Sequence, residues 1–284
     1  MMGEGTHGGF WQRLVRGSRW TWFDERFRSA LPDDFDEMVM AIESRDRFHA
    51  KQGRSTARVV FHGPRGPLPV YLKRHERLPW ASRLAALVDP RGRHTPGAAE
   101  FAHLERARKL GLAVPEVVAA GERIGPWGRL QSFLIIAELT GSLPLNEAMP
   151  VLVEQLDPAA LVSLKRGLTR EMAAIAATLH RANAFHKDLY LCHFFLDMAK
   201  VDRAGDRLAL IDLHRLAEHR FWPVRWRCKD LAQLLFSVEG VPGIERGDVL
   251  RFWARYRKLT GLKYSRWQGR MVAWKAARYS RHNH

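Results

Sequence analysis

The sequence feature that most constrains the fold is a long amphipathic pattern in the second half of the chain. Residues 159–183 carry apolar side chains three or four positions apart, at 161, 164, 168, 172, 175 and 179, which predicts a helix with one buried face. The segment HKDLYLCHFFLD, residues 186–197, follows directly. It sets a carboxylate and two imidazoles among apolar residues. A buried turn with locally paired polar groups would explain this segment alone, so its interpretation depends on the rest of the chain.

The part of the chain before this helix is predicted to consist mainly of strands. Its expected elements are strands at 57–63 and 68–75, a helix at 97–112, and strands at 116–122 and 130–139. The turn-rich GPRGP between the first two strands predicts a hairpin, with Lys73 near the end of its second strand. The helix carries Glu100 and is stopped by Gly111 and Pro115. TGSLPLNE, residues 140–147, then interrupts the pattern with glycine and proline.

After the long helix we expect a short strand at 207–215 that contains Asp212, and a second apolar helix at 229–240. The chain thus begins with strands and one helix, continues through a glycine and proline break, and ends with mostly helices. This order predicts an α+β fold of two lobes with a cleft between them. We therefore divide the chain into an N-terminal extension, a strand-rich lobe and a helical lobe, at residues 1–45, 46–140 and 141–284.

Charge and composition limit the partners and the compartment. The 284 residues carry a formal net charge of +16, so the expected partners are anionic, such as nucleic acid, phosphorylated ligands or a membrane surface. Two cysteines, Cys192 and Cys228, are too few for a disulfide framework. No apolar run is long enough to span a bilayer, and the N-terminus lacks the apolar core of a signal peptide. We expect a cytoplasmic protein.

Four charged residues occur in the order that the protein-kinase fold uses. They are a strand lysine (Lys73), a helix glutamate (Glu100), an aspartate after the long helix (Asp188) and an aspartate at a strand end (Asp212). The lysine can neutralise nucleotide phosphates and the glutamate can orient it. One aspartate can accept the proton of an attacking hydroxyl, and the other can hold Mg²⁺. Each residue alone would more commonly be a surface ion pair or a cap, but together they predict a phosphotransferase.

Three segments, HKDLYLCHFFLD, LIDLHR and RCKDLAQLLFS, resemble the lipopolysaccharide kinase family (the InaA/WaaP group). The resemblance runs from about residue 45 to residue 240. It implies a protein-kinase-like bilobal fold, with an antiparallel β-sheet and one main helix in the N-lobe and a mostly α-helical C-lobe. It also implies ATP and Mg²⁺ as cofactors, and a heptose or Kdo sugar of the lipid-linked inner core of lipopolysaccharide as acceptor.

The same resemblance implies a role for individual residues. Asp188 is the expected catalytic carboxylate, Asp212 and His193 are the expected metal ligands, and Asp230 is expected to brace the catalytic loop through its backbone. The nucleotide-binding candidates are Lys73, Glu100, Gly53, Ser55 and Glu138.

Several positions depart from the protein-kinase pattern. KQGRSTARVV supplies Gly53 and Ser55 but no G-x-G-x-x-G, so Arg54, Arg58 or backbone N–H groups are alternative phosphate contacts. Tyr190 stands where protein kinases often place a phosphate-binding lysine, which leaves Lys187 or Arg215 for that role. Only 18 residues separate Asp212 from Asp230 and no A-P-E follows, so a small or glycolipid acceptor fits better than a peptide.

Other functions stay open at this point. A small-molecule phosphotransferase of the same fold, a basic nucleic-acid-binding or membrane-binding protein, and a catalytically inactive scaffold are the alternatives. Residues 251–284 hold ten lysines or arginines and no acidic residue, with tryptophan and tyrosine between them. This segment either packs as a closing helical element or also attracts the protein to an anionic membrane surface, as peripheral association at the inner face of the inner membrane would require.

Overall fold

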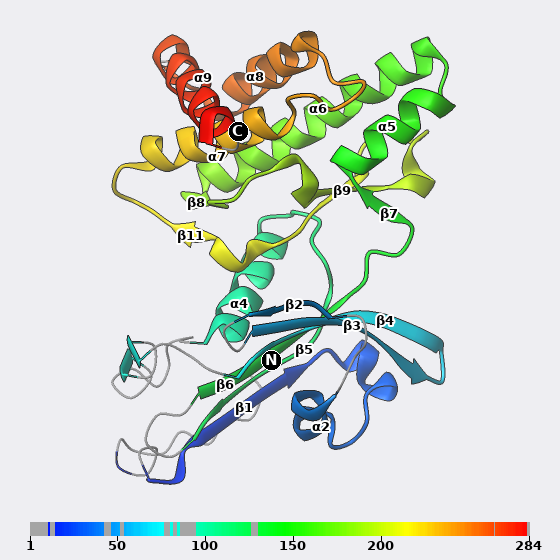
Figure 1. The fold of residues 1–284 in the computed structure, drawn as a ribbon, viewed down its shortest axis with the longest axis vertical. Coiled ribbons are helices and arrows are strands. Elements are labelled where there is room, and N and C mark those ends of the chain that lie inside the picture. The colour runs from blue at the N-terminus through cyan, green and yellow to red at the C-terminus, as the bar shows by residue number, and fades with distance from the viewer. Residues whose placement is uncertain are drawn as a thin grey trace. The chain divides into compact units, whose positions relative to one another are not determined.

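The computed structural model describes residues 11, 15–42, 47–51, 54–76, 80–81, 84–85, 95–125, 130–263 and 265–282. The chain divides into two units, which Figure 1 draws as ribbons. Unit 1 comprises Met1–Arg106 and Pro115–Glu138, and unit 2 comprises Ala107–Val114 and Leu139–His284. The break between the units at residue 138 lies close to the glycine and proline stretch that begins at residue 140.

Unit 1 is built on a six-stranded antiparallel sheet with the strand order β1-β5-β6-β4-β3-β2. The strands are β1 (Ser18–Phe23), β2 (Arg47–Lys51), β3 (Arg54–Gly63), β4 (Gly66–His75), β5 (Val117–Ile124) and β6 (Leu130–Ala137). The predicted hairpin is present, and its register places Lys73 of β4 opposite Thr56 of β3 and Leu134 of β6. A central strand therefore positions Lys73.

Residues 18–42, which were expected to belong to a separate N-terminal extension, complete this sheet and its core. β1 pairs with β5 along its whole length, and a short 3-10 helix, η1 (Glu25–Ala30), leads to α2 (Phe35–Ala41). Phe35 and Val39 of α2 lie in one hydrophobic cluster with residues of β3 to β6. In SRWTWF the side chains of Trp20 and Trp22 point the same way, as alternate residues of a strand do, and both contact Phe101. This alternation was the signal for β1 in the sequence.

The helix α4 (Pro96–Lys109) carries Glu100 and matches the predicted helix to within three residues. Phe101, Leu104 and Ala107 are buried along one face. Gly97 lets the first turn approach β6 closely, because a Cβ atom there would lie 2.9 Å from the Ser132 hydroxyl oxygen. Glu100 therefore lies on a helix that packs against the sheet of unit 1.

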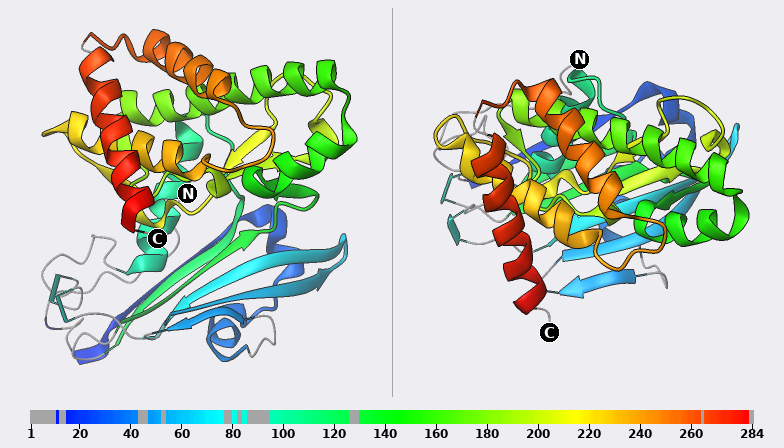
Figure 2. Two further views of the ribbon diagram at one scale, coloured as in Figure 1. Left: turned by 45° about the horizontal axis from the view of Figure 1, so that its top comes forward. Right: turned by 90° about the horizontal axis from the view of Figure 1, so that it is seen from above.

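Unit 2 is mostly helical, and Figure 2 shows its long helices from two further directions. The helices are α5 (Leu145–Gln155), α6 (Pro158–Arg181), α7 (Pro223–Ser237), α8 (Arg246–Thr260) and α9 (Ser265–His282). The predicted apolar stripe of α6 is confirmed, since five of its six positions are buried: Leu164, Leu168, Met172, Ile175 and Leu179. The sixth, Leu161, lies near the start of the helix and is partly buried. α6 packs against α8, and α7 packs against α9.

Short strands and turns hold the polar segments of unit 2. A three-stranded sheet has the order β10-β9-β7, from β7 (Ser142–Pro144), β9 (Phe194–Asp197) and β10 (Leu208–Leu210), and β8 (Ala184–Phe185) pairs with β11 (Ala217–Glu218). The 3-10 helices are η3 (Leu191–His193), η4 (Met198–Lys200) and η5 (Leu213–Arg215). The strand that was expected over 207–215 is shorter, because the backbone turns at Asp212, which has φ 60° and ψ 50°. The expected second helix starts earlier, at Pro223.

Candidate active site

The loop between β8 and η3 holds Asp188, and the buried carboxylate of Asp230 fixes its backbone. The backbone N–H groups of His186 and Lys187 each donate to Asp230 at 2.8 Å. Lys187 has φ 69°, a left-handed conformation that non-glycine residues rarely adopt. Two hydrogen bonds to a buried charge stabilise that conformation. The predicted bracing role of Asp230 is confirmed by these contacts.

A second layer of buried polar groups supports Asp230. His180 Nε2 lies 3.2 Å from Asp230 Oδ2, and its Nδ1 lies 2.7 Å from the hydroxyl of Tyr256 on α8. Burial raises the pKa of Tyr256, so the phenol stays a hydrogen-bond donor. The consistent arrangement is that Tyr256 donates to His180, and His180 donates to Asp230. His180 therefore has a packed, structural role.

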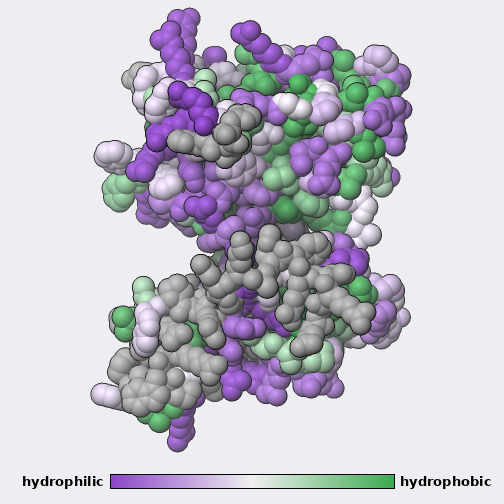
Figure 3. Space-filling view, viewed as in Figure 1, coloured by the Kyte–Doolittle hydropathy of each residue, from purple (hydrophilic) through white to green (hydrophobic). Residues whose placement is uncertain are grey.

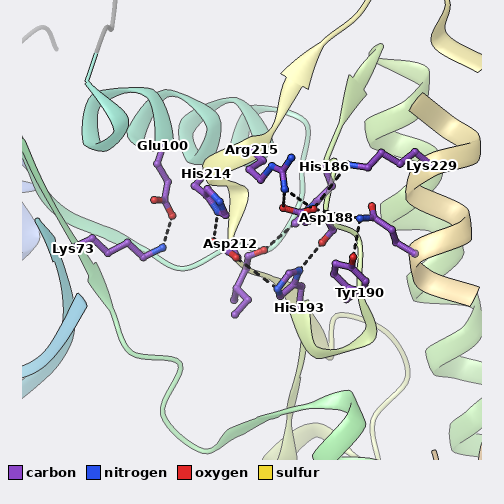
Figure 4. Close-up of polar contacts among 12 residues, drawn as sticks. Lys73, Glu100, His186, Asp188, Tyr190, His193, Asp212, His214, Arg215 and Lys229 are labelled. Atoms are coloured by element: carbon purple, nitrogen blue, oxygen red, sulfur yellow. Dashed lines mark hydrogen bonds and ion pairs between the residues drawn. The ribbon is translucent and has the colours of Figure 1, made fainter. Parts of the chain in front are cut away.

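The carboxylate of Asp188 lies among cationic and polar side chains from later parts of unit 2 (Figure 4). Arg215 Nη1 donates to its two oxygens at 2.8 and 3.1 Å. Gln233 Nε2 donates at 3.3 Å, and Lys229 Nζ lies 3.9 Å away. Burial lowers the pKa of Lys229, although the neighbouring Asp188 acts in the opposite direction. The site is thus suited to an anionic group near the Asp188 carboxylate.

Asp212 lies beside two histidines, as Figure 4 shows. His214 Nδ1 donates to Asp212 Oδ1 at 2.5 Å, and His193 Nε2 lies 3.6 Å from Asp212 Oδ2. His193 Nδ1 is 2.7 Å from the backbone carbonyl oxygen of Asp188, and a carbonyl can only accept, so Nδ1 carries the hydrogen. In the neutral ring the lone pair of Nε2 then faces the Asp212 carboxylate, and the two side chains offer one nitrogen and one oxygen ligand for a cation.

The side chains of Asp212 and His193 are suited to bind a metal ion that is also bound by the phosphates of a nucleotide. Mg²⁺ in phosphoryl-transfer sites is bound through one or two carboxylates together with phosphate oxygens and water. Among the residues that the structure describes, no group of three or more histidine, cysteine, aspartate or glutamate side chains is placed to bind a metal without such help. His193 is a softer ligand than Mg²⁺ prefers.

In unit 1, Lys73 and Glu100 form the expected ion pair. Lys73 Nζ lies 2.5 Å from Glu100 Oε1, and the two side chains are 12% and 2% exposed. β4 supplies the lysine and α4 supplies the glutamate, and Figure 4 shows that the two side chains point toward each other. The ammonium group is held in place by a buried partner, as a phosphate-binding lysine requires.

The other nucleotide-binding candidates have different surroundings. The Ser55 hydroxyl accepts a hydrogen bond from Arg74, whose buried guanidinium also donates to backbone carbonyls of α2 and of Ile42. Glu138 accepts hydrogen bonds from Arg58, which lower the pKa of Glu138. Gly53 lies outside the described residues.

Sequence reasoning missed most partners of the two aspartates. Arg215, Gln233 and Lys229 at Asp188, and His214 at Asp212, were not predicted as a group. Lys229 immediately precedes the bracing residue Asp230, which is the signal that could have placed it at the loop. The side chain of Lys187, one of two candidates for a phosphate contact, has its Nζ over the ring of Trp226, 5.0 Å from the ring centroid.

Comparison with known proteins decides which family this arrangement belongs to. The model of the lipopolysaccharide kinase (Kdo/WaaP) family matches residues 90–256. The lipopolysaccharide core heptose(I) kinase WaaP of Pseudomonas aeruginosa is 32% identical over 239 residues, which cover 84% of this chain and 86% of that protein. The chain belongs to the lipopolysaccharide kinase family.

Two further relatives agree with this assignment. WaaP of Escherichia coli is 31% identical over 159 residues, or 55% of this chain and 58% of that protein. The solved structure of WaaP in complex with acyl carrier protein matches with a TM-score of 0.67 and 28% identity, over 92% of this chain and 98% of that one. The predicted protein-kinase-like α+β fold is therefore confirmed, and this member of the lipopolysaccharide kinase family is a phosphotransferase that uses ATP.

Proposed function

We propose that this kinase transfers the γ-phosphoryl group of ATP to a hydroxyl of a heptose in the inner core of lipopolysaccharide. The observation that carries the proposal is the braced loop that presents Asp188, with Asp212 and His193 beside it. The relatives named above as heptose(I) kinases support heptose over Kdo as the acceptor. The short stretch between Asp212 and Asp230 supports a sugar over a peptide.

In this proposal Asp188 orients the acceptor hydroxyl and takes its proton as the hydroxyl oxygen bonds to the γ-phosphorus. The bond from that phosphorus to the bridging oxygen of ADP breaks at the same time, and ADP leaves. Arg215 and Lys229 lie close enough to Asp188 to bind an anionic group of the acceptor or of the nucleotide. Positioning and charge stabilisation supply most of the catalysis in reactions of this class.

Asp212 and His193 would hold Mg²⁺. When bound, the ion neutralises charge on the phosphates of the nucleotide. The hydrogen bond from His214 fixes the rotation of the Asp212 carboxylate, so that its second oxygen faces His193. In unit 1, Lys73 would bind phosphate oxygens while Glu100 keeps its ammonium group oriented. Gly53, Ser55 and Glu138 remain predicted nucleotide contacts, and Ser55 and Glu138 would have to exchange or share their present partners.

The deciding experiment measures transfer of labelled phosphate from ATP to a panel of core-lipid acceptors, small sugars and proteins. We expect transfer to a heptose-containing core acceptor, and loss of about 10²–10⁴-fold in turnover for Asp188→Ala. Asp33→Ala, which removes a fully exposed carboxylate of unit 1, is the matched control and should keep full turnover. Wild-type turnover in a folded Asp188→Ala protein would refute the kinase mechanism.

We also propose acyl carrier protein as a partner, because unit 2 contains a cavity suited to an acyl chain. The cavity has a volume of about 290 Å³. Its lining is mostly aliphatic and comes from α5 to α9, and includes Leu168, Leu231, Leu234 and Val272. The protein also has a formal net charge of +16, which would complement an anionic partner surface. The related WaaP structure was solved with acyl carrier protein.

This partner can be tested with one carrier in two forms. Carrier protein loaded with a long acyl chain should bind more tightly than carrier with only its phosphopantetheine arm. Val272→Phe should fill the cavity and remove that difference, whereas Val162→Phe changes an exposed valine of α6 and should not. Equal binding of both carrier forms to the wild-type protein would contradict the proposal.

A further inference from the structure

The segment between β11 and α7 exposes two adjacent aromatic side chains, Phe221 and Trp222, which we call the aromatic tip. Their exposed fractions are 86% and 78%, the largest among the large hydrophobic side chains of the described residues. Exposed apolar side chains that stand together commonly mark a binding surface. The segment projects from one side of unit 2 in Figure 1 and in both views of Figure 2.

The backbone holds this tip in an unfavourable conformation. Trp222 has φ 60° and ψ 43° at the start of α7, a left-handed conformation that is a real outlier for a bulky residue. Pro223 follows it, and a residue before proline favours extended dihedral angles, which are far from those of Trp222. Glycine would adopt this conformation without strain, so the presence of tryptophan points to a role for its side chain.

The base of the tip is connected to the catalytic loop. One turn along α7, Trp226 stacks on His219 with ring centroids 4.2 Å apart, and Lys187 Nζ lies over the same ring. Lys187 is the neighbour of Asp188, and Asp230 of α7 binds its backbone N–H. A helical rise of about 1.5 Å per residue places Asp230 roughly 12 Å along α7 from Trp222.

Charge identifies the surface that the tip would meet. Arg220 precedes the aromatic tip and Arg225 follows it, and both side chains are exposed. Aromatic side chains next to arginines are the composition that favours the headgroup region of an anionic bilayer. The headgroup layer is about 6 Å thick on each side of the hydrocarbon core. A tip inserted there would keep the Asp188 loop within about two helical turns of the lipid surface.

We infer that the aromatic tip inserts into the headgroup region of an anionic membrane and holds the Asp188 loop where a lipid-linked sugar is presented. This inference rests on the proposed function, since a water-soluble acceptor would make such insertion unnecessary. It names a contact separate from the basic C-terminal helices α8 and α9. Figure 3 shows hydrophilic side chains projecting at the end of unit 2 where those helices lie. On α8, the side chains of Arg255, Arg257 and Lys258 are exposed.

The experiment measures binding to two kinds of vesicle that contain no acceptor. One kind is phosphatidylethanolamine with phosphatidylglycerol, and the other is neutral phosphatidylcholine. We expect the wild-type protein to bind the anionic vesicles in a salt-sensitive way, and the double variant Phe221→Ser with Trp222→Ser to lose about tenfold or more in affinity. Trp80→Ser, which removes a 71% exposed tryptophan of unit 1, is the matched control and should bind as the wild type does.

Two readouts separate a membrane contact from other roles of the tip. Quenching of tryptophan fluorescence by brominated lipid should fall in Trp222→Phe, because the inserted indole is missing. The ratio of turnover on vesicle-embedded acceptor to turnover on a short-chain soluble acceptor should fall about tenfold in the double variant, relative to wild type.

Unchanged vesicle binding of the folded double variant would overturn the inference. The membrane contact would be assigned to α8 instead if vesicle binding were weakened only by the substitutions Arg255→Gln, Arg257→Gln and Lys258→Gln. The two proposals can fail separately. If the protein transfers no phosphate to any core acceptor in detergent, the proposed function is refuted. If its vesicle binding still depends on the aromatic tip, the membrane contact is retained.

Discussion

The bracing of the catalytic loop by Asp230 leads to a quantitative prediction for Asp230→Asn. The Asp230 side chain is fully buried and accepts hydrogen bonds from two backbone N–H groups and from His180. An asparagine keeps the shape but replaces one acceptor oxygen with an NH₂ donor. In either orientation of the amide, one backbone N–H group faces a donor and loses its partner.

The size of the effect follows from these contacts. A hydrogen bond to a charged group contributes about 1.5–3 kcal/mol, and leaving a buried donor unpaired adds its desolvation cost. We therefore expect Asp230→Asn to lower the free energy of unfolding of unit 2 by roughly 2–4 kcal/mol. For a domain of this size, that loss lowers the melting temperature by about 5–15 °C. Turnover should also fall, because the loop that carries Asp188 loses a constraint.

Asp157→Asn is the matched control in the same unit. Asp157 caps α6 by accepting from the N–H groups of Ala159 and Ala160, and it is exposed. One oxygen accepts both bonds, and asparagine caps a helix as well as aspartate does, so stability should change by less than about 0.5 kcal/mol. Thermal and urea unfolding followed by circular dichroism measure both variants. Equal stability of Asp230→Asn and Asp157→Asn would refute the argument that the buried carboxylate braces the loop.

Three further changes test other parts of the structure. Lys73→Met and Glu100→Gln should each weaken ATP binding. Calorimetry of ATP binding to the two single variants and the double variant should give a coupling energy of about 1–3 kcal/mol. Additive losses would mean that the pair does not act together. Burial opposes the ionised form of Asp248, but hydrogen bonds from Arg251, the Glu245 N–H and Lys165 outweigh it and lower the pKa of Asp248. Asp248→Asn should therefore be less stable than wild type near neutral pH, and urea unfolding should show this difference disappear as the pH falls below about 4; a difference that is constant with pH would contradict this. Gly167→Ala should destabilise unit 2 although alanine favours helices, because the added Cβ would meet the Arg207 guanidinium that Glu171 holds in place. Gly269→Ala is the control, because its Cβ would have ordinary van der Waals spacing. In thermal unfolding it should be neutral or stabilising by up to about 1 kcal/mol.

The sequence predicted those parts of the molecule that are encoded by local pattern. The stripe of α6, the β3–β4 hairpin and the bracing role of Asp230 rest on periodicity, turn residues or short motifs. β1 was missed because its alternation covers only the six residues Ser18–Phe23, too few to stand out among the charged and aromatic residues around them. The contacts of Asp188 were missed because Arg215 and Gln233 are 27 and 45 residues away, and no spacing rule relates positions so far apart.

The buried polar groups of unit 2 show why such distant contacts matter for the reaction. Tyr256, His180 and Asp230 form a chain from α8 through α6 to α7, and each of these side chains is almost completely buried. Apolar residues would fill the same space without the cost of desolvating polar groups. The chain of hydrogen bonds ends on the backbone of the loop at Lys187, where the conformation is unfavourable for a side-chain-bearing residue. The core of unit 2 is thus built to hold the loop beside Asp188 in one conformation, which is what a reaction that depends on positioning requires.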